Sequence, residues 1–133
     1  MMDFIFTSES VTPGHPDKLC DQISDAAIDA FLKLDSLSRA AVECAVASGV
    51  VFIAARFASN AAPDLASIAR DVIADAGYTS GDFDSKTCSI LTNFTELPAG
   101  SRLNSEEPDL QFRSEQQVNA FGFACCDTPE LMP

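Results

Sequence analysis

The sequence predicts an α+β fold, with helices packed on one face of a mostly antiparallel sheet. The predicted elements follow the order strand, helix, two strands, helix, strand. The helical segments each carry one apolar stripe, whereas the strands carry apolar residues at both alternating positions. One layer of helices covers only one face of a sheet. We therefore expect the other face to be used for dimerisation, or else to be covered by a further part of a longer chain.

A helix is predicted over residues 17–34, after a short strand at residues 3–6. Its apolar residues recur at three- and four-residue spacing, which places them on one helical face: Leu19, Ile23, Ala26, Ala27, Ala30, Phe31 and Leu34. Four aspartates follow one another at four-residue spacing on another face: Asp17, Asp21, Asp25 and Asp29. A solvated acidic face is the ordinary interpretation of this stripe. The alternative is that Asp17, beside the preceding loop, coordinates a cation.

A β-hairpin is predicted at residues 40–47 and 50–58, because small and β-branched residues flank a turn at Ser48 and Gly49. Glu43 interrupts the first strand, and Arg56 interrupts the second. A carboxylate in an apolar strand usually lies at an edge or is paired, and sometimes it binds a cation. The pattern leaves these alternatives open for Glu43.

A second helix is predicted over residues 63–76, with Pro63 in its first turn and Gly77 at its C-terminal cap. Its buried stripe comprises Leu65, Ile68, Ala69, Val72, Ile73 and Ala76. Residues 87–94 are expected to form another strand. The polar residues 96–113 are expected to form an exposed loop, and residues 120–125 a last short strand.

Length and charge exclude several classes of protein. The chain has 133 residues, which suits one domain, and its formal net charge is −12. An acidic chain lacks the clustered cations that bind nucleic acid or an anionic membrane surface, so we expect neither partner. The number of cysteines, five, is odd, and no secretory signal pattern opens the chain. We therefore expect reduced thiols that are buried or half-buried, and a cytoplasmic location.

The loop before the first helix has the residue types of a phosphate site. His15 lies between Gly14 and Pro16, so its backbone is rigid, and a helix N-terminus follows, which attracts anions. Asp17 offers a hard oxygen ligand suited to Mg²⁺, and Lys18 offers a point charge for phosphate. A lone loop histidine is more often solvated than functional, but these neighbours favour a functional role here.

The runs FTSESV at residues 6–11 and GHPDK at residues 14–18 resemble the opening of methionine adenosyltransferases, also called S-adenosylmethionine synthetases. The similarity continues in DQISDA at residues 21–26, around Glu43, in FGFA at residues 121–124 and in TPELMP at residues 128–133. In that family, ATP and L-methionine react at a site between two subunits. The methionine sulfur attacks the ribose C5′, and the tripolyphosphate that leaves is hydrolysed to phosphate and diphosphate.

The resemblance implies roles for individual residues. His15 and Lys18 would be catalytic residues near the leaving phosphates, and Glu9 belongs to the same ATP- and phosphate-binding motif. Asp17 would be a Mg²⁺ ligand, and Glu43 would lie near a K⁺ ion. The resemblance also implies a homodimer or higher oligomer. Residues 1–100 would form the N-terminal domain, and residues 101–133 an exposed loop and the first strand of a truncated central domain.

Several positions depart from the family pattern. Arg56 stands where the second hairpin strand usually carries a Glu for the amino-acid substrate, and Glu96 or Leu97 replaces a Gln. The usual glycine-rich segment with an Asp-Gln pair is SEQQVN at residues 114–119. The phosphate and metal corner of the site is thus kept, while the methionine and adenosine corner is altered.

Two functional hypotheses follow. The chain is either the N-terminal domain of a methionine adenosyltransferase, or a degenerate, non-catalytic relative that self-associates as a binding or interaction module. It contains three lysines, of which only Lys18 lies near the motif. Tripolyphosphate carries about four negative charges and is held by converging cations, so we expect the isolated chain to be inactive.

Overall fold

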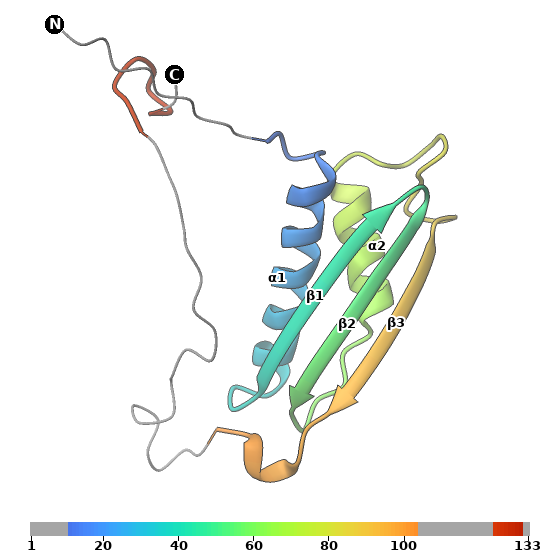
Figure 1. Cartoon of the computed structure of the whole chain (residues 1–133), viewed down its shortest axis with the longest axis vertical. Coiled ribbons are helices and arrows are strands. Elements are labelled where there is room, and N and C mark those ends of the chain that lie inside the picture. The colour runs from blue at the N-terminus through green and yellow to red at the C-terminus, as the bar shows by residue number, and fades with distance from the viewer. Residues whose placement is uncertain (1–10, 104–123, 132–133) are drawn as a thin grey trace, which may run out of the picture. The chain divides into compact units, whose positions relative to one another are not determined.

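The structure is a computed structural model that describes residues 11–103 and 124–131. The chain divides into two compact units, Val11–Gln111 and a second that combines Met1–Ser10 with Phe112–Pro133. In the first unit the elements run, in chain order, as α1 (Pro16–Leu34), β1 (Arg39–Ala47), β2 (Val50–Ala58), α2 (Leu65–Asp75), β3 (Ser89–Glu96) and the short 3₁₀ helix η1 (Ala99–Ser101) (Figure 1).

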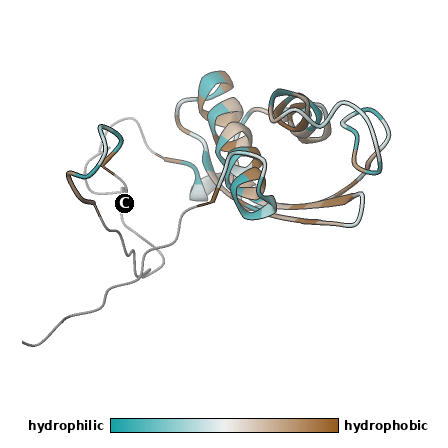
Figure 2. Ribbon diagram, turned by 90° about the horizontal axis from the view of Figure 1, so that it is seen from above, coloured by the Kyte–Doolittle hydropathy of each residue, from teal (hydrophilic) through white to brown (hydrophobic). Residues whose placement is uncertain are grey.

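The three strands form one sheet in the order β1-β2-β3. β1 and β2 are the antiparallel arms of the predicted hairpin, with Val42 opposite Ala55. β3 pairs with β2 in parallel, with Ile90 opposite Val51, and α2 makes the crossover that a parallel pair requires. Both helices lie on the same side of the sheet (Figures 1 and 2). The predicted α+β class with helices on one face is therefore confirmed.

The first helix has nearly the predicted bounds. It begins at Pro16, which suits the first helical position because a proline there loses no intrahelical hydrogen bond. It ends at Leu34, and the backbone N–H of Asp35 closes the last turn on the Phe31 carbonyl. All four aspartates of the acidic stripe are exposed, as a solvated acidic face requires.

The second helix begins two residues later than predicted. Asp64 is its N-cap, because its carboxylate accepts a hydrogen bond from the Ser67 N–H at 3.1 Å. The expectation that Pro63 lies in the first turn is therefore wrong. The carboxylate of Asp64 satisfies a backbone donor that Pro63 cannot, so the helix begins after it. Gly77 lies just beyond the C-cap with φ of +97°, and its predicted role at the helix end is confirmed.

The core lies between the helices and the inner face of the sheet. Its buried members come from both helices, two strands and the segment before β3: Leu19, Ile23, Ala27, Phe31, Val42, Val51, Ile53, Ala55, Leu65, Ala69, Ile73 and Cys88. The rings of Phe31 and Phe57 lie 4.9 Å apart, which joins α1 to β2. Burial of each large aliphatic or aromatic side chain contributes roughly 1.5–3 kcal/mol, so this layer holds α1 and α2 on the sheet.

The outer face of the sheet, opposite the helices, carries exposed apolar side chains. Phe52 is 42% exposed, Leu91 is 56% exposed, and the two lie side by side in the β2–β3 register. Val50 is 37% exposed on the same face. The sheet is thus apolar on both faces, as the sequence pattern indicates, and the described residues cover only one of them.

The segments after β2 differ in part from expectation. β3 extends to Glu96, two residues beyond the predicted strand. The predicted exposed loop is described as far as residue 103, and within it Arg102 and Leu103 are half-buried rather than exposed. Arg102 is held by the Asp35 carboxylate and Leu103 by the Leu37 carbonyl. Residues 104–113 lie outside the described residues.

The remaining expectations concern the chain ends and the cysteines. The predicted strand at residues 3–6 lies outside the described residues, as do residues 120–123 of the predicted last strand, while Ala124 and Cys125 are not in a strand. All five cysteines are free, but Cys126 is exposed, contrary to expectation, because it lies in a short turn segment outside the core. None of the helices in the described part of the chain is long and apolar enough to cross a membrane.

The half-buried Cys44 thiol lies next to a second thiol, that of Cys20. Burial on the inner face of β1, together with the neighbouring Cys20 thiol of α1, raises the pKa of the Cys44 thiol to about 12. A thiol with a raised pKa is a poor nucleophile at neutral pH, which agrees with a packing role for Cys44.

Candidate functional site

His15 is the N-cap of α1. Its backbone is extended, and its ring Nδ1 accepts a hydrogen bond from the Asp17 N–H at 3.1 Å. An imidazole nitrogen that accepts a hydrogen bond carries no proton, so the ring proton lies on Nε2. The His15 side chain is 43% exposed. His15 therefore presents an Nε2–H donor while its other nitrogen is engaged by the helix.

Asp17 keeps its carboxylate free of this capping interaction. The distance from Nδ1 of His15 to Oδ2 of Asp17 is 3.9 Å, but Nδ1 is already the acceptor for the Asp17 N–H. The contact is therefore not an ion pair in the neutral tautomer. The Asp17 side chain is 85% exposed, which leaves its oxygens available to a cation from solution.

Lys18 completes a small cluster of donors in the first turn of α1. Pro16 has no N–H, the Asp17 N–H donates to His15, and the Leu19 N–H donates to the His15 carbonyl at 2.9 Å. The Lys18 N–H is left without a backbone acceptor among the described residues. This turn thus offers an anion the Nε2–H of His15 together with the N–H and ammonium group of Lys18.

The loop before α1 is held at two points. The His15 N–H donates to the Thr12 carbonyl at 2.9 Å, within the loop. The hydroxyl of Tyr78, which follows α2, donates to the Gly14 carbonyl at 2.5 Å. Sequence reasoning did not identify Tyr78, because 64 residues separate it from Gly14. The only local signal was the predicted helix end at Gly77, which places Tyr78 in the residues that close α2.

Glu43 is not brought to His15 within one chain. It lies in β1 opposite Ala54 and is exposed on the outer face of the sheet, whereas α1 packs on the inner face. Arg56 is exposed on the same outer face, opposite Ala41, and is therefore a diagonal cross-strand neighbour of Glu43. Glu9 lies outside the described residues.

The two implied metals fit these residues to different degrees. Asp17 suits Mg²⁺, which typically takes one or two protein carboxylates and completes its shell with phosphate and water. Glu43 is the only carboxylate on the outer face of the three described strands, and Arg56 places a competing positive charge nearby. Among the described residues there is no group of three or more potential metal ligands. By its chemistry Asp17 fits Mg²⁺ better than Glu43 fits K⁺, and both metals stay predictions.

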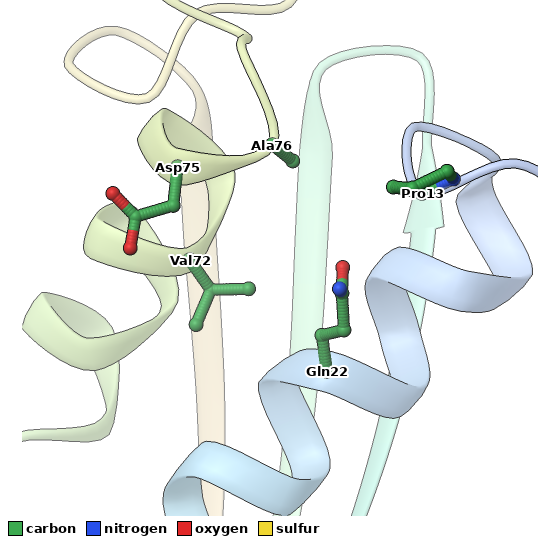
Figure 3. A pocket seen from close by; sticks show the side chains of 5 residues that line it. All are labelled: Pro13, Gln22, Val72, Asp75 and Ala76. Carbon is green, nitrogen blue, oxygen red and sulfur yellow. The ribbon is translucent and has the colours of Figure 1, made fainter.

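An open pocket of about 240 Å³ lies between α1 and α2, next to the loop before α1. It is lined by Pro13, Gln22, Val72, Asp75 and Ala76, and in Figure 3 Gln22 points into the space between the helices. The Asp75 carboxylate points away from α1 in that view. The lining contains no cation and none of His15, Asp17 and Lys18, so this pocket is not the candidate phosphate site.

Comparison with known proteins decides the family. Residues 3–98 match the family described as S-adenosylmethionine synthetase, N-terminal domain. The chain belongs to the S-adenosylmethionine synthetase family. It is 46% identical to the S-adenosylmethionine synthase of Prochlorococcus marinus (strain MIT 9515) over 143 aligned positions, which cover 100% of this chain. It is also 46% identical to the S-adenosylmethionine synthase of Desulfosudis oleivorans over 134 positions, which cover 97% of this chain.

The chain spans about a third of the length of these S-adenosylmethionine synthases, 35% and 34% respectively. The match confirms the N-terminal domain of a methionine adenosyltransferase that the motifs predict. Both relatives are named as synthases, so the comparisons give no support to a degenerate, non-catalytic module. The roles of individual site residues and the division at residue 100 stay predictions.

Proposed function

We propose that this chain serves as the phosphate-binding N-terminal domain of a methionine adenosyltransferase. The whole enzyme would convert ATP, L-methionine and water to S-adenosylmethionine, phosphate and diphosphate. The observation that supports this most directly is the His15 N-cap, since it frees an Nε2–H donor in the same helical turn as the exposed Asp17 and the Lys18 N–H. Because the chain is a family member, that turn is the natural place for the nucleotide phosphates.

Each group in the turn would have a distinct task. The Nε2–H of His15 donates to an oxygen of the leaving tripolyphosphate, and Lys18 adds a positive charge to the same group. Asp17 alone would repel phosphate, so it belongs in the site only as a Mg²⁺ ligand. A bound Mg²⁺ would neutralise phosphate charge there. Glu9 would contribute to the same ATP-binding motif.

The described residues do not complete this site by themselves. Tripolyphosphate carries about four negative charges, and converging cations are needed to stabilise it as it leaves. The chain has a net charge of −12 and only three lysines. We therefore infer that other parts of a longer enzyme, or a partner chain, supply the missing cations. Methionine would also be bound largely by those parts, since Arg56 stands where the family carries a Glu.

A second subunit would cover the outer sheet face and bring its own Glu43 into the assembly. The exposed Phe52 and Leu91 favour such a homodimer or a higher oligomer. K⁺ binding near Glu43 is part of the proposal inherited from the family resemblance, and Arg56 is expected to weaken it. The five free cysteines agree with a reducing, cytoplasmic setting for the enzyme.

Titration calorimetry with inorganic tripolyphosphate, with and without Mg²⁺, tests the phosphate site. We expect weak binding, with Kd on the order of 1 mM, that requires Mg²⁺. Asp17→Asn removes the metal ligand but keeps the side-chain size, and it should abolish the Mg²⁺ dependence. Asp29→Asn is the matched control, because it removes the same charge from the same stripe three turns along the helix. Equal binding by all three proteins, or binding by none, would overturn the proposal.

A further inference from the structure

We propose that Tyr78 is a positioning residue for His15. The Tyr78 hydroxyl lies 2.5 Å from the Gly14 carbonyl oxygen, although the two residues are 64 positions apart. Nothing in the motif around His15 points to this residue. The consequence for ligand binding rests on the proposed phosphate site, whereas the effect on the His15 ring does not.

The hydrogen bond fixes the peptide group that joins Gly14 to His15. The carbonyl of this group accepts from Tyr78, and its N–H donates to the Thr12 carbonyl at 2.9 Å. Because a peptide group is planar, anchoring both its polar atoms sets the orientation of the whole unit. The Cα of His15 is attached to that unit, so its position is set, and only rotation about the N–Cα bond remains to be fixed.

The next peptide group is fixed by the helix. The His15 carbonyl accepts the first intrahelical hydrogen bond, from the Leu19 N–H at 2.9 Å. The ring is then oriented by the hydrogen bond from the Asp17 N–H to Nδ1. Both peptide groups that flank His15 are therefore restrained, and so is its ring. Within the part of the chain that the structure describes, Tyr78 supplies the one restraint that comes from far away in the sequence.

Tyr78 is itself held firmly enough to serve this purpose. Its N–H donates to the Ile73 carbonyl at 3.1 Å, and the Gly77 N–H donates to the Ala74 carbonyl at 2.9 Å. This is the Schellman pattern that closes a helix, and the positive φ of Gly77 permits it. The Tyr78 ring also packs edge-to-face on Phe83, with ring centres 5.0 Å apart. The C-terminal end of α2 thus holds the Tyr78 hydroxyl in position to donate to the Gly14 carbonyl.

Close packing at Gly14 supports the same conclusion. A Cβ placed on Gly14 would lie 3.6 Å from the Tyr78 hydroxyl, so the tyrosine ring end lies directly against this part of the loop. The contact is ordinary van der Waals distance and involves no strain. The loop therefore packs against the Tyr78 side chain in addition to accepting its hydrogen bond.

The chain offers an unusually clean test, because His15 is its only histidine and Tyr78 its only tyrosine. Nuclear magnetic resonance of the imidazole nitrogens and the Hε1 proton reports on His15 alone. Tyr78→Phe removes the hydroxyl and keeps the ring that packs on Phe83. We expect the variant to shift the His15 signals toward a mixture of tautomers and to weaken Mg²⁺-dependent tripolyphosphate binding by roughly three- to ten-fold.

Ser59→Ala is the matched control, since it also removes a hydroxyl that bridges two segments. The Ser59 hydroxyl bonds to Ser38 at 2.7 Å, beyond the opposite end of α1. That helix has 19 residues and is therefore about 28 Å long. Ser59→Ala should lower thermal stability to a similar extent and leave the His15 signals unchanged. If the two variants shift the His15 signals equally, the effect of Tyr78 is general loosening and the proposal is wrong.

Two further outcomes are distinguishable. If the wild-type protein binds no tripolyphosphate, the proposed function fails, while the His15 spectrum still decides the role of Tyr78. Unmoved His15 signals in Tyr78→Phe would overturn the positioning role whatever the binding result. Should that variant not fold, incorporation of 3-fluorotyrosine at position 78 keeps the ring and alters the hydroxyl as a donor. The His15 signals should then move, and their constancy would again contradict the proposal.

Discussion

Arg102 binds the carboxylate of Asp35 with two hydrogen bonds, from Nε to Oδ2 at 2.7 Å and from Nη2 to Oδ1 at 2.5 Å. The two residues are 67 positions apart, and Asp35 is the C-cap of α1. The same carboxylate accepts from the Asn60 N–H at 2.9 Å. One side chain therefore joins the end of α1, the connection from β2 to α2, and the segment after η1.

Because of this ion pair, the stability of the fold should decrease as the pH is lowered into the acid range. The pKa of Asp35 is held well below its usual range, mainly by the Arg102 guanidinium. The hydrogen bonds from the Asn60 and Leu37 N–H groups lower it further. A carboxyl with a lowered pKa in the folded state stabilises the fold above its unfolded pKa of about 3.9 and loses that contribution as pH falls further. Asp35→Asn should therefore destabilise the protein at pH 7 and have a much smaller effect near pH 2.

Urea unfolding at several pH values between about 7 and 2 measures this difference. Asp25→Asn is the control, because Asp25 is an exposed aspartate of α1 in the acidic stripe. Its effect on the free energy of unfolding should be small. A destabilisation by Asp35→Asn that stays constant across the range would show that the lost interaction is steric rather than electrostatic.

The core between α1 and the sheet should dominate stability. Ile23 is fully buried, so Ile23→Ala leaves a cavity and should lower the free energy of unfolding by about 2–5 kcal/mol. Leu32→Ala is the control, because Leu32 is 44% exposed on the same helix and should change stability by no more than about 0.5 kcal/mol. Chemical denaturation at neutral pH compares them. Equal losses would mean that α1 is not seated on the sheet as described.

The outer sheet face should control assembly. Phe52→Arg or Leu91→Arg places a charge among the exposed apolar residues of this face and should convert a dimer or larger oligomer to monomers. Sedimentation velocity at high micromolar concentration measures the outcome. Leu34→Arg serves as the control, because Leu34 is 66% exposed at the end of α1, away from this face. A wild-type chain that sediments as a clean monomer would refute the prediction.

The isolated 133-residue chain should form no detectable S-adenosylmethionine from ATP and methionine with Mg²⁺ and K⁺. The chain has too few cations to stabilise the charge of the tripolyphosphate as it leaves, even if it binds tripolyphosphate weakly. Chromatographic detection of the product is the measurement, and His15→Ala is the specificity control. Product that forms with the wild-type chain and disappears with His15→Ala would show that the described residues suffice.

Local patterns predicted the helices and the hairpin well, because each depends on neighbours in sequence. The apolar spacing of Leu19, Ile23 and Ala27 specifies a helix, and the small turn at Ser48 and Gly49 specifies the hairpin. The start of α2 was misplaced because two signals compete there. Proline at a first-turn position and aspartate as an N-cap are both favourable, and the carboxylate of Asp64 prevails by satisfying a backbone donor.

The sequence predicted which residues belong to the candidate site, but not how these residues are arranged in space. GHPDK at residues 14–18 pointed to phosphate and Mg²⁺, but not to His15 as the N-cap, although a proline at the next position is typical of that role. The sequence also offered no means of separating Glu43 from His15. Only the packing of α1 on the inner sheet face, while Glu43 is exposed on the outer one, places the sheet between them.

The sequence by itself determined the family, the residue types of the phosphate site, the two helices and the hairpin, because motifs and periodicity are local properties. Tertiary structure alone decided that β3 pairs in parallel with β2, that Arg102 closes on Asp35, and that Tyr78 seats the loop before His15. These contacts join residues that are far apart in the chain. They form only when burial of the shared core brings the elements together, so no local pattern encodes them.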